Sequence, residues 1–248
     1  MAPDVHRETA RPATLTWSLV IPVKVLAQAK SRLTGLAGQR RSEFALAMAA
    51  DTVSAAIRAD NVAAVLVVTD DPDVSDIAAS LGAVVLADTP GAGLNEALRH
   101  GAAYSGDRWP DRGRAGLAGD LPALRPAELT AALGAAARLG TAFVPDTDGT
   151  GTTLYAAVPG TRFEPRFGPA SRDRHLATGA AEIGTGEIGT AEIGTGLIGT
   201  AEIGTDLAGL RRDVDTIEDL RAAAKIGLGP RTHALLEADG MNAELLGL

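Results

Sequence analysis

The chain has 248 residues, of which 46% are hydrophobic, 22% are charged and only 3% are aromatic. This length predicts one compact domain whose core is built from aliphatic side chains. The formal net charge of −8 argues against a nucleic-acid binder, which needs a basic surface. The lack of cysteine excludes disulfide scaffolds, zinc–thiolate sites and thiol nucleophiles. No apolar run is long enough for a membrane span or a signal peptide, so we expect a cytoplasmic protein without a membrane partner.

The first half of the chain alternates between apolar strands and amphipathic helices. Residues 1–15 are polar and non-periodic, which predicts a disordered tail. Buried strands are predicted at 17–23, 62–69 and 83–86, because these runs are short and rich in β-branched residues. Helices are predicted at 38–59, where apolar residues recur on one face, and from Pro72 to Leu81, after a Thr-Asp-Asp start signal.

The second half continues the pattern with helices at 93–103 and 126–139 and strands at 114–119 and 141–144. A strand at 152–158, whose direction is left open, precedes a loop at 162–169, a short helix after Ser171 and a final strand at 211–215. Thr216 is expected to cap a helix to Ile226. The alternation predicts an α/β three-layer sandwich with a mainly parallel central sheet. We place the domain at 16–235 and a C-terminal tail at 236–248.

Residues 182–205 are five near-identical pentapeptides built on Glu-Ile-Gly-Thr. A period of five fits neither a helix nor an alternating strand, and each unit carries a flexible glycine and only one isoleucine. The segment is therefore predicted to be an inserted, mobile surface loop, and a binding lid is the less favoured alternative.

A basic loop follows the first predicted strand, with Lys24, Lys30 and Arg32 as cations and Ser31 as a hydroxyl donor. Loops at the carboxyl ends of parallel strands bind ligands, and this one could wrap a triphosphate. The spacing is neither that of a P-loop nor that of a dinucleotide fingerprint. A solvated basic turn is the alternative interpretation.

Acidic residues follow two later strands of the prediction. Gly119 and Asp120 end one strand, and a carboxylate there suits Mg²⁺, which takes oxygen ligands and bridges phosphates. Asp213 and Asp215 would share one face of the last strand, so either could be a second metal ligand. Asp is also common in strand-to-helix turns and helix caps, so a purely local role is the alternative for each.

Two further motifs suit small ligands. Gly93 permits close approach of a flat group, and Asn95 offers a donor and an acceptor for a base edge. Small and hydroxyl residues at 148–153, with Arg166 and Ser171, could bind a phosphate or carboxylate. An ordinary loop and a hairpin bend are the alternatives. The four histidines show no metal spacing and are interpreted as surface or packing residues.

Taken together and in this order, the motifs resemble the guanylyltransferases of coenzyme F420 biosynthesis, in particular the actinobacterial type that uses phosphoenolpyruvate. The resemblance covers roughly residues 17–234 and includes Ile-Pro-Val-Lys24, Ala-Lys30-Ser-Arg32, Thr-Asp70-Asp, Gly93-Leu-Asn95, Gly119-Asp120-Leu-Pro and Arg-Asp213-Val-Asp215-Thr. It implies a nucleotidyltransferase (GT-A-like) fold, with GTP as co-substrate and Mg²⁺ as cofactor.

The resemblance also implies residue roles. Asp120 and Asp213 match metal-binding aspartates, with Asp215 as a rival to Asp213. Residues matching the phosphoenolpyruvate site are Thr152, Gly168 and Ser171. Residues expected at the nucleotide are Lys24, Lys30, Ser31, Arg32, Asp70, Gly93, Asn95 and Gly119, and the catalytic set is Lys24, Lys30, Arg32 and Asp120. The chain departs from the pattern by the pentapeptide insertion and by Ile217 where proline is usual.

The expected reaction moves GMP from GTP to the phosphate of phosphoenolpyruvate and releases pyrophosphate. Other acceptors left open are 2-phospho-L-lactate and 3-phosphoglycerate. Another nucleotidyl- or glycosyltransferase of the same fold is the second alternative, and a non-catalytic nucleotide-binding protein is the third. A homodimer is compatible with the resemblance.

Overall fold

A computed structural model describes residues 15–26, 38–184, 200–202 and 206–238. The described strands are β1 (Trp17–Pro22), β2 (Val62–Val68), β3 (Val84–Leu86), β4 (Gly113–Leu117), β5 (Thr141–Pro145), β6 (Thr152–Ala157), β7 (Ala181–Gly184) and β8 (Thr200–Glu202). The described helices are α1 (Gly38–Ile57), α2 (Pro72–Leu81), α3 (Leu94–Arg108), α4 (Pro126–Leu139), α5 (Ser171–Leu176), α6 (Ala208–Arg211), α7 (Ile217–Ile226) and α8 (Pro230–Ala238). None of these helices is long and apolar enough to span a bilayer.

The strands form one sheet in the order β3-β2-β1-β4-β6-β5-β7-β8. All neighbours pair in parallel except β6, which runs antiparallel to β4 and β5. The prediction of a mainly parallel sheet is therefore confirmed, and the open direction of the sixth strand is resolved as antiparallel. The chain moves from β1 to β2 on one side and reaches β4 on the other, which creates the switch point where α/β sheets bind ligands.

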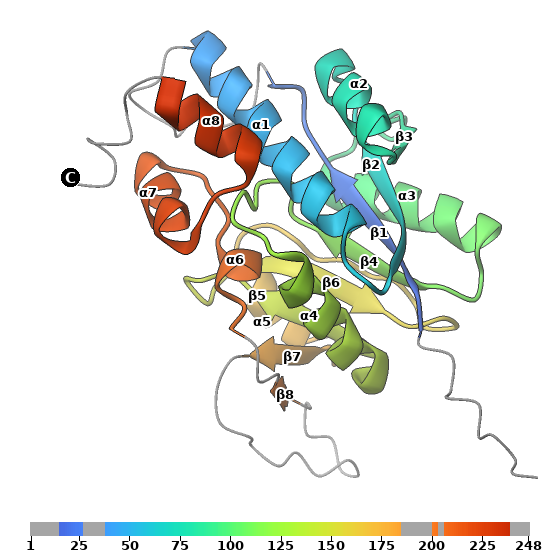
Figure 1. Ribbon diagram of the computed structural model, residues 1–248. Coiled ribbons are helices and arrows are strands. Elements are labelled where there is room, and N and C mark those ends of the chain that lie inside the picture. Colours follow the sequence, from blue (N-terminus) through green and yellow to red (C-terminus); the bar gives the residue numbers. More distant parts are fainter. Residues whose placement is uncertain (1–14, 27–37, 185–199, 203–205, 239–248) are drawn as a thin grey trace, which may run out of the picture.

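Helices cover both faces of the sheet, with α1, α4 and α8 on one face and α3 on the other (Figure 1). Alternation along β1 produces this division. Leu19 and Ile21 join the core cluster that includes α1 and α4, whereas Val20 joins the cluster that includes α3. Helix α3 lies close to the sheet, because a Cβ on its Gly101 would come within 2.5 Å of the Val20 side chain.

Three expectations need correction. Residues 212–216 are not a strand; α6 ends at Arg211, and the segment after it pairs only locally, through the Val214 N–H to the Asp120 carbonyl (3.1 Å). The predicted C-terminal boundary at 235 cuts through α8, because Leu236 is 1% exposed and belongs to the core.

The third correction concerns the repeat, of which residues 182–184 and 200–202 lie in strands. Glu182 to Gly184 continue β7, and β8 pairs with them in parallel. At the start of the repeat, buried and half-buried side chains alternate as in a strand. Ala181 and Ile183 are buried, and Glu182 between them is half-buried. Its first unit therefore extends the core even though the five-residue period cannot continue as a strand. Residues 185–199 and 203–205 of the repeat, residues 1–14 of the tail predicted at 1–15, and the residues after 238 lie outside the described part.

Candidate active site

The predicted carboxylates meet at the carboxyl edge of the sheet. Asp120 lies just past the end of β4, and a Cβ on the preceding Gly119 would be 3.2 Å from the Pro22 carbonyl at the end of β1. The Val214 N–H donates to the Asp120 carbonyl oxygen at 3.1 Å, which brings the Asp213 segment beside Asp120. The acidic motifs, separated by more than ninety positions in the sequence, are thus neighbours.

The electrostatics of Asp213 confirm this proximity. Burial, and then the negative charge of Asp120, raises the pKa of the Asp213 carboxyl to about 7. The carboxylates of Asp146 and Asp215 act in the same direction. A buried group among like charges is costly to ionise, and a bound cation would relieve that cost.

Asp146 is the acidic neighbour that sequence analysis missed. It follows β5 as Asp120 follows β4, so the rule that points to strand ends could have found it. Its carboxylate accepts the N–H groups of Thr150 (2.9 Å) and Gly151 (2.8 Å), which shapes the turn before β6. A Cβ on Gly151 would lie 2.2 Å from Asp146 Oδ2, so this close turn requires glycine.

His175 organises the predicted acceptor site from α5. Its Nε2 accepts the backbone N–H of Arg166 at 2.8 Å, and its Nδ1 lies 3.0 Å from the Thr152 hydroxyl. Burial lowers the pKa of His175 to about 4, so the ring is neutral at pH 7. Because Nε2 is an acceptor in this tautomer, Nδ1–H donates to Thr152. The hydroxyl proton of Thr152 is therefore free to donate elsewhere.

Aromatic rings fix the orientation of His175. Tyr155 stacks on it at 4.7 Å between ring centroids, with Phe143 at 5.3 Å and the edge of Phe167 at 5.8 Å. The imidazole is fully buried. The sequence predicts this histidine only as a surface or packing residue, and the structure adds its two hydrogen bonds.

The first residue of α5 presents an unpaired hydroxyl. Ser171 is 1% exposed, and its Oγ has no hydrogen-bond partner among the described residues. The preceding Ala170 has a φ of 53°, the only positive φ of a non-glycine residue in the described chain, and Gly168 has a φ of 111°. The left-handed backbone at Ala170 fixes the geometry of the turn that precedes α5, and the unpartnered Ser171 Oγ is available to bond a ligand there.

The residues that we expect at the nucleotide differ in where the structure places them. Lys24 is exposed, and with Gly93 it lines a pocket beyond β1 and β2. Asp70 accepts the backbone N–H of Asp88 at 3.0 Å. Lys30, Ser31 and Arg32 lie outside the described residues.

Asn95 is used differently from the expected base contact. Its Oδ1 accepts the Phe167 N–H at 2.8 Å, and its Nδ2 donates to the Phe167 carbonyl at 3.0 Å. The amide thus anchors the loop before α5 to the start of α3. This contact connects the nucleotide side of the site with the acceptor side.

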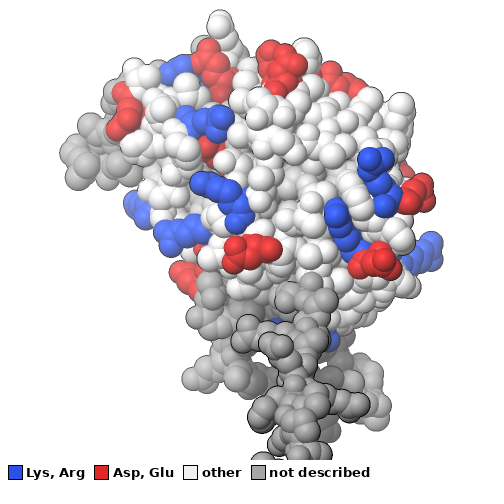
Figure 2. Space-filling model, turned by 45° about the vertical axis from the view of Figure 1, so that its right-hand side comes forward, with Lys and Arg blue, Asp and Glu red and all other residues white. Residues whose placement is uncertain are grey.

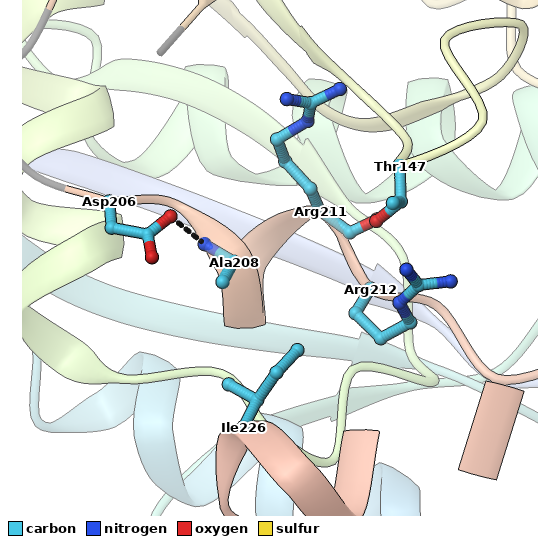
Figure 3. A pocket seen from close by; sticks show the side chains of 6 residues that line it. All are labelled: Thr147, Asp206, Ala208, Arg211, Arg212 and Ile226. Atoms are coloured by element: carbon cyan, nitrogen blue, oxygen red, sulfur yellow. Dashed lines mark hydrogen bonds between the residues drawn. The ribbon is translucent and has the colours of Figure 1, made fainter. Parts of the chain in front are cut away.

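A second pocket lies beside the acidic cluster, between Thr147, Asp206, Arg211, Arg212 and Ile226. Figure 3 shows Arg211 and Arg212 on one side of it and Asp206 on the other, where Asp206 accepts the Ala208 N–H. Arg211 is already engaged, since its guanidinium donates to the carbonyls of Pro145 (3.1 Å) and Asp146 (2.8 Å). Its role here is to hold the Asp146 segment.

Comparison with known proteins places this site in a family. Residues 17–183, which include Asp120, Thr152, Ser171 and His175, match the family described as "Guanylyl transferase CofC like". The chain belongs to this family. Together with its relatives, this makes it a CofC-like nucleotidyltransferase of the guanylyltransferase type.

The relatives of this CofC-like chain include curated bacterial proteins. It is 51% identical over 228 residues to the phosphoenolpyruvate guanylyltransferase of Thermomonospora curvata, covering 92% of each chain. It is 50% identical over 225 residues to the protein of the same name from Salinispora arenicola, covering 90% of this chain and 94% of that one. The predicted family resemblance is confirmed.

Solved structures confirm the fold. A protein from Desulfovibrio desulfuricans G20, assigned to the nucleotide-diphospho-sugar transferases, superposes with a TM-score of 0.61 at 17% identity, covering 92% of this chain and 96% of that one. A Methanothermobacter nucleotidyl transferase superposes with a TM-score of 0.54 at 18% identity, covering 85% and 97%. The CofC-like chain thus has the nucleotidyltransferase fold that the sequence predicts.

Proposed function

We propose that this guanylyltransferase moves GMP from GTP to the phosphate of phosphoenolpyruvate, giving enolpyruvyl-diphospho-5'-guanosine and pyrophosphate, as a step of coenzyme F420 biosynthesis. The proposal rests above all on the site's layout. The Asp120–Asp213 carboxylate pair lies at the same sheet edge as Thr152. The names of the relatives support the choice of substrates.

Thr152 and Ser171 are proposed to bind the acceptor. The Thr152 hydroxyl accepts from His175 and so can donate its own proton, while Ser171 Oγ is buried and unpaired among the described residues. Hydroxyl donors of this kind suit a carboxylate or phosphate oxygen. Phosphoenolpyruvate, 2-phospho-L-lactate and 3-phosphoglycerate all carry both groups, so the other two acids are the alternative acceptors.

We propose Mg²⁺ as the cofactor, held by Asp120 and Asp213. The donor set fits, because both ligands are carboxylates, and burial, followed by the negative charge of Asp120, raises the pKa of Asp213. Among the described residues no group of three or more Asp, Glu, His or Cys side chains is arranged to hold a metal alone. Mg²⁺ commonly uses one or two carboxylates together with substrate phosphates. When bound, the ion would neutralise charge on the phosphates.

The protein's part in the reaction is positioning. An oxygen of the acceptor phosphate attacks the α-phosphorus of GTP, and the bond from that phosphorus to the β-phosphate oxygen breaks to release pyrophosphate. Lys24, at the end of β1, would stabilise charge on the leaving group, with Lys30 and Arg32 of the same loop. A phosphate dianion is already nucleophilic, so the site needs no general base.

The homodimer that the family resemblance allows is a separate proposal. The molecular mass in solution, measured by light scattering, tests it.

Pyrophosphate release with GTP and each of the three acids, in the presence of Mg²⁺, tests this function. Release that requires both GTP and one acid supports it and identifies the acceptor. If the folded protein releases no pyrophosphate with any of the three acids, the proposal is overturned.

The metal ligands are tested by Asp120→Asn and Asp213→Asn. We expect kcat to fall by two or more orders of magnitude, since charge stabilisation of this kind accounts for about 10²–10³ in rate. The Mg²⁺-dependent rise in Tm with GTP present should also disappear. Asp107→Asn, on α3, is a matched control expected to behave as wild type. An Asp120→Asn protein with normal turnover and normal Mg²⁺ response would contradict the assignment.

A further inference from the structure

A pocket opens at the carboxyl ends of β1 and β2, where α3 begins. Its walls are mainly apolar and include Val23, Val68, Leu94 and Ala97. Its charged residues are Lys24 and Asp88. A pocket with apolar walls and a few polar groups is typical of a small-molecule site.

Asp88 has an unsatisfied carboxylate oxygen in this pocket. Its Oδ1 is buried and has no hydrogen-bond partner among the described residues. A buried acceptor without a donor is costly, and such a group in a pocket indicates a ligand that supplies the donor. The residue is held in place from its backbone, because its N–H donates to Asp70 Oδ1 at 3.0 Å.

The chemistry of an ionised carboxylate limits which ligands can bond to Asp88. It offers acceptors only, so it requires a partner with adjacent donors. Among the bases of the common nucleoside triphosphates, guanine alone presents two neighbouring donors, N1–H and the N2 amino group, on one edge. Adenine, cytosine and uracil each place an acceptor next to their donor there.

We propose that Asp88 selects guanine, by accepting hydrogen bonds from N1–H and the N2 amino group of the base while the apolar walls contact its faces. This inference rests on the proposed function and adds the residue that makes the enzyme specific for GTP. Lys24 lines the same pocket and would lie on the side of the phosphates. The predicted Asp70 acts indirectly, as the residue that positions Asp88.

The Asp88→Asn variant provides a gain-of-function test. An asparagine offers one acceptor and one donor, which match N1–H and the C2 oxygen of xanthine. We expect kcat/KM for GTP to fall, and that for xanthosine triphosphate to rise, each by on the order of a hundredfold, because a bidentate base contact discriminates by about that factor. The affinities of GTP and xanthosine triphosphate, measured by calorimetry without any acceptor, should shift in the same directions.

The matched control is Asp76→Asn, an exposed carboxylate on α2 that undergoes the same chemical change. It should retain the wild-type preference for GTP. An Asp88→Asn protein that also keeps this preference would overturn the proposal.

A second variant covers the case in which Asp88→Asn binds neither nucleotide. Inosine triphosphate lacks the N2 amino group, so wild type should prefer GTP over it, and Asp88→Ala should lose that preference. A GTP-to-inosine-triphosphate ratio unchanged in Asp88→Ala would overturn the proposal. These measurements concern the base alone. Failure of the proposed function would instead appear in wild type, as GTP binding without pyrophosphate release for any acceptor.

Discussion

At the scale of single residues, the acceptor site depends on a histidine that does no acid–base chemistry. His175 is buried among three aromatic rings and bonds through both ring nitrogens. Its low pKa keeps it neutral, and neutrality gives Nδ1 a proton to donate while Nε2 accepts. The ring thereby sets both the direction of the Thr152 hydroxyl and the position of the Arg166 backbone.

Replacing His175 with phenylalanine keeps the ring but removes both hydrogen bonds. We expect the KM for the acceptor to rise about tenfold, because one oriented hydrogen bond is lost. The KM for GTP should change little. His233→Phe, an exposed position on α8, is the control. Steady-state kinetics with each substrate varied in turn measure the effect. A rise in the KM for GTP alone would contradict this role.

His175 also makes stability depend on pH. Its pKa falls from 6.5 to about 4 on folding, so the unfolded chain takes up a proton between these values and the folded chain does not. The stabilisation is complete above pH 6.5 and is lost as the pH falls toward 4, by up to about 3 kcal/mol. In urea unfolding at several pH values, the stability of wild type relative to His175→Phe should fall over this range, because the opposite contribution of the raised Asp213 pKa is common to both proteins. Parallel curves would exclude it.

At the scale of secondary-structure elements, the connection from α4 to α6 is held by a buried carboxylate. Glu128 accepts the N–H groups of Arg125 (3.2 Å) and Gly209 (3.0 Å), and burial raises its pKa. Helix α6 packs so closely there that a Cβ on Gly209 would lie 2.1 Å from the Ala123 carbonyl. This contact fixes where the chain turns toward Asp213.

Gly209→Ala should therefore destabilise the protein by about 1–3 kcal/mol, because the backbone must move to admit the methyl group. Gly134→Ala is the matched control in α4, where an added Cβ meets nothing within 4 Å. The control should stabilise by about 0.5–1 kcal/mol, since alanine favours helix more than glycine. Chemical denaturation measures both. Equal effects of the same sign would show that the close contact is unimportant.

Local pattern predicts most elements correctly but not the last of the expected strands. The capped helix after Thr216 is confirmed, with Thr216 Oγ1 accepting the Asp219 N–H. The expected strand at 211–215 failed because Asp213 and Val214 alternate like a strand while no neighbouring strand is available to pair with them. The rule that points to strand ends predicts Asp120, and it holds equally for Asp146 and for Asp88, which lies two residues past β3.

At the scale of the whole molecule, the antiparallel β6 brings the site together. Parallel strands end at one edge, so β4 and β5 deliver Asp120 and Asp146 there. Only a strand of opposite direction can begin at that edge, and β6 begins with Thr152. Sequence pattern could not reveal this, because strand direction depends on pairing between distant segments. On the face in Figure 2, basic and acidic side chains are interspersed.

The described parts of the pentapeptide segment, in β7 and β8, lie at the sheet edge away from Asp120. β8 is the last strand of the sheet, and β7, β5 and β6 lie between it and β4. Replacing residues 185–202 with a Gly/Ser linker should therefore leave kcat and both KM values within about twofold, while Tm falls slightly through loss of the β7–β8 pairing. Kinetics and thermal unfolding test this. A loss of kcat with the fold intact would show that the insertion takes part in the reaction.

The pairing of β8 with β7 has a consequence for inheritance. Thr200-Ala-Glu202, which forms β8, is spelled identically at residues 190–192, two repeat units earlier. A gene that loses or gains two units by replication slippage still encodes the same three residues for the edge of the sheet. The number of repeat units can thus change between generations without changing the residues that pair with β7. Natural length variants should therefore share one folded domain.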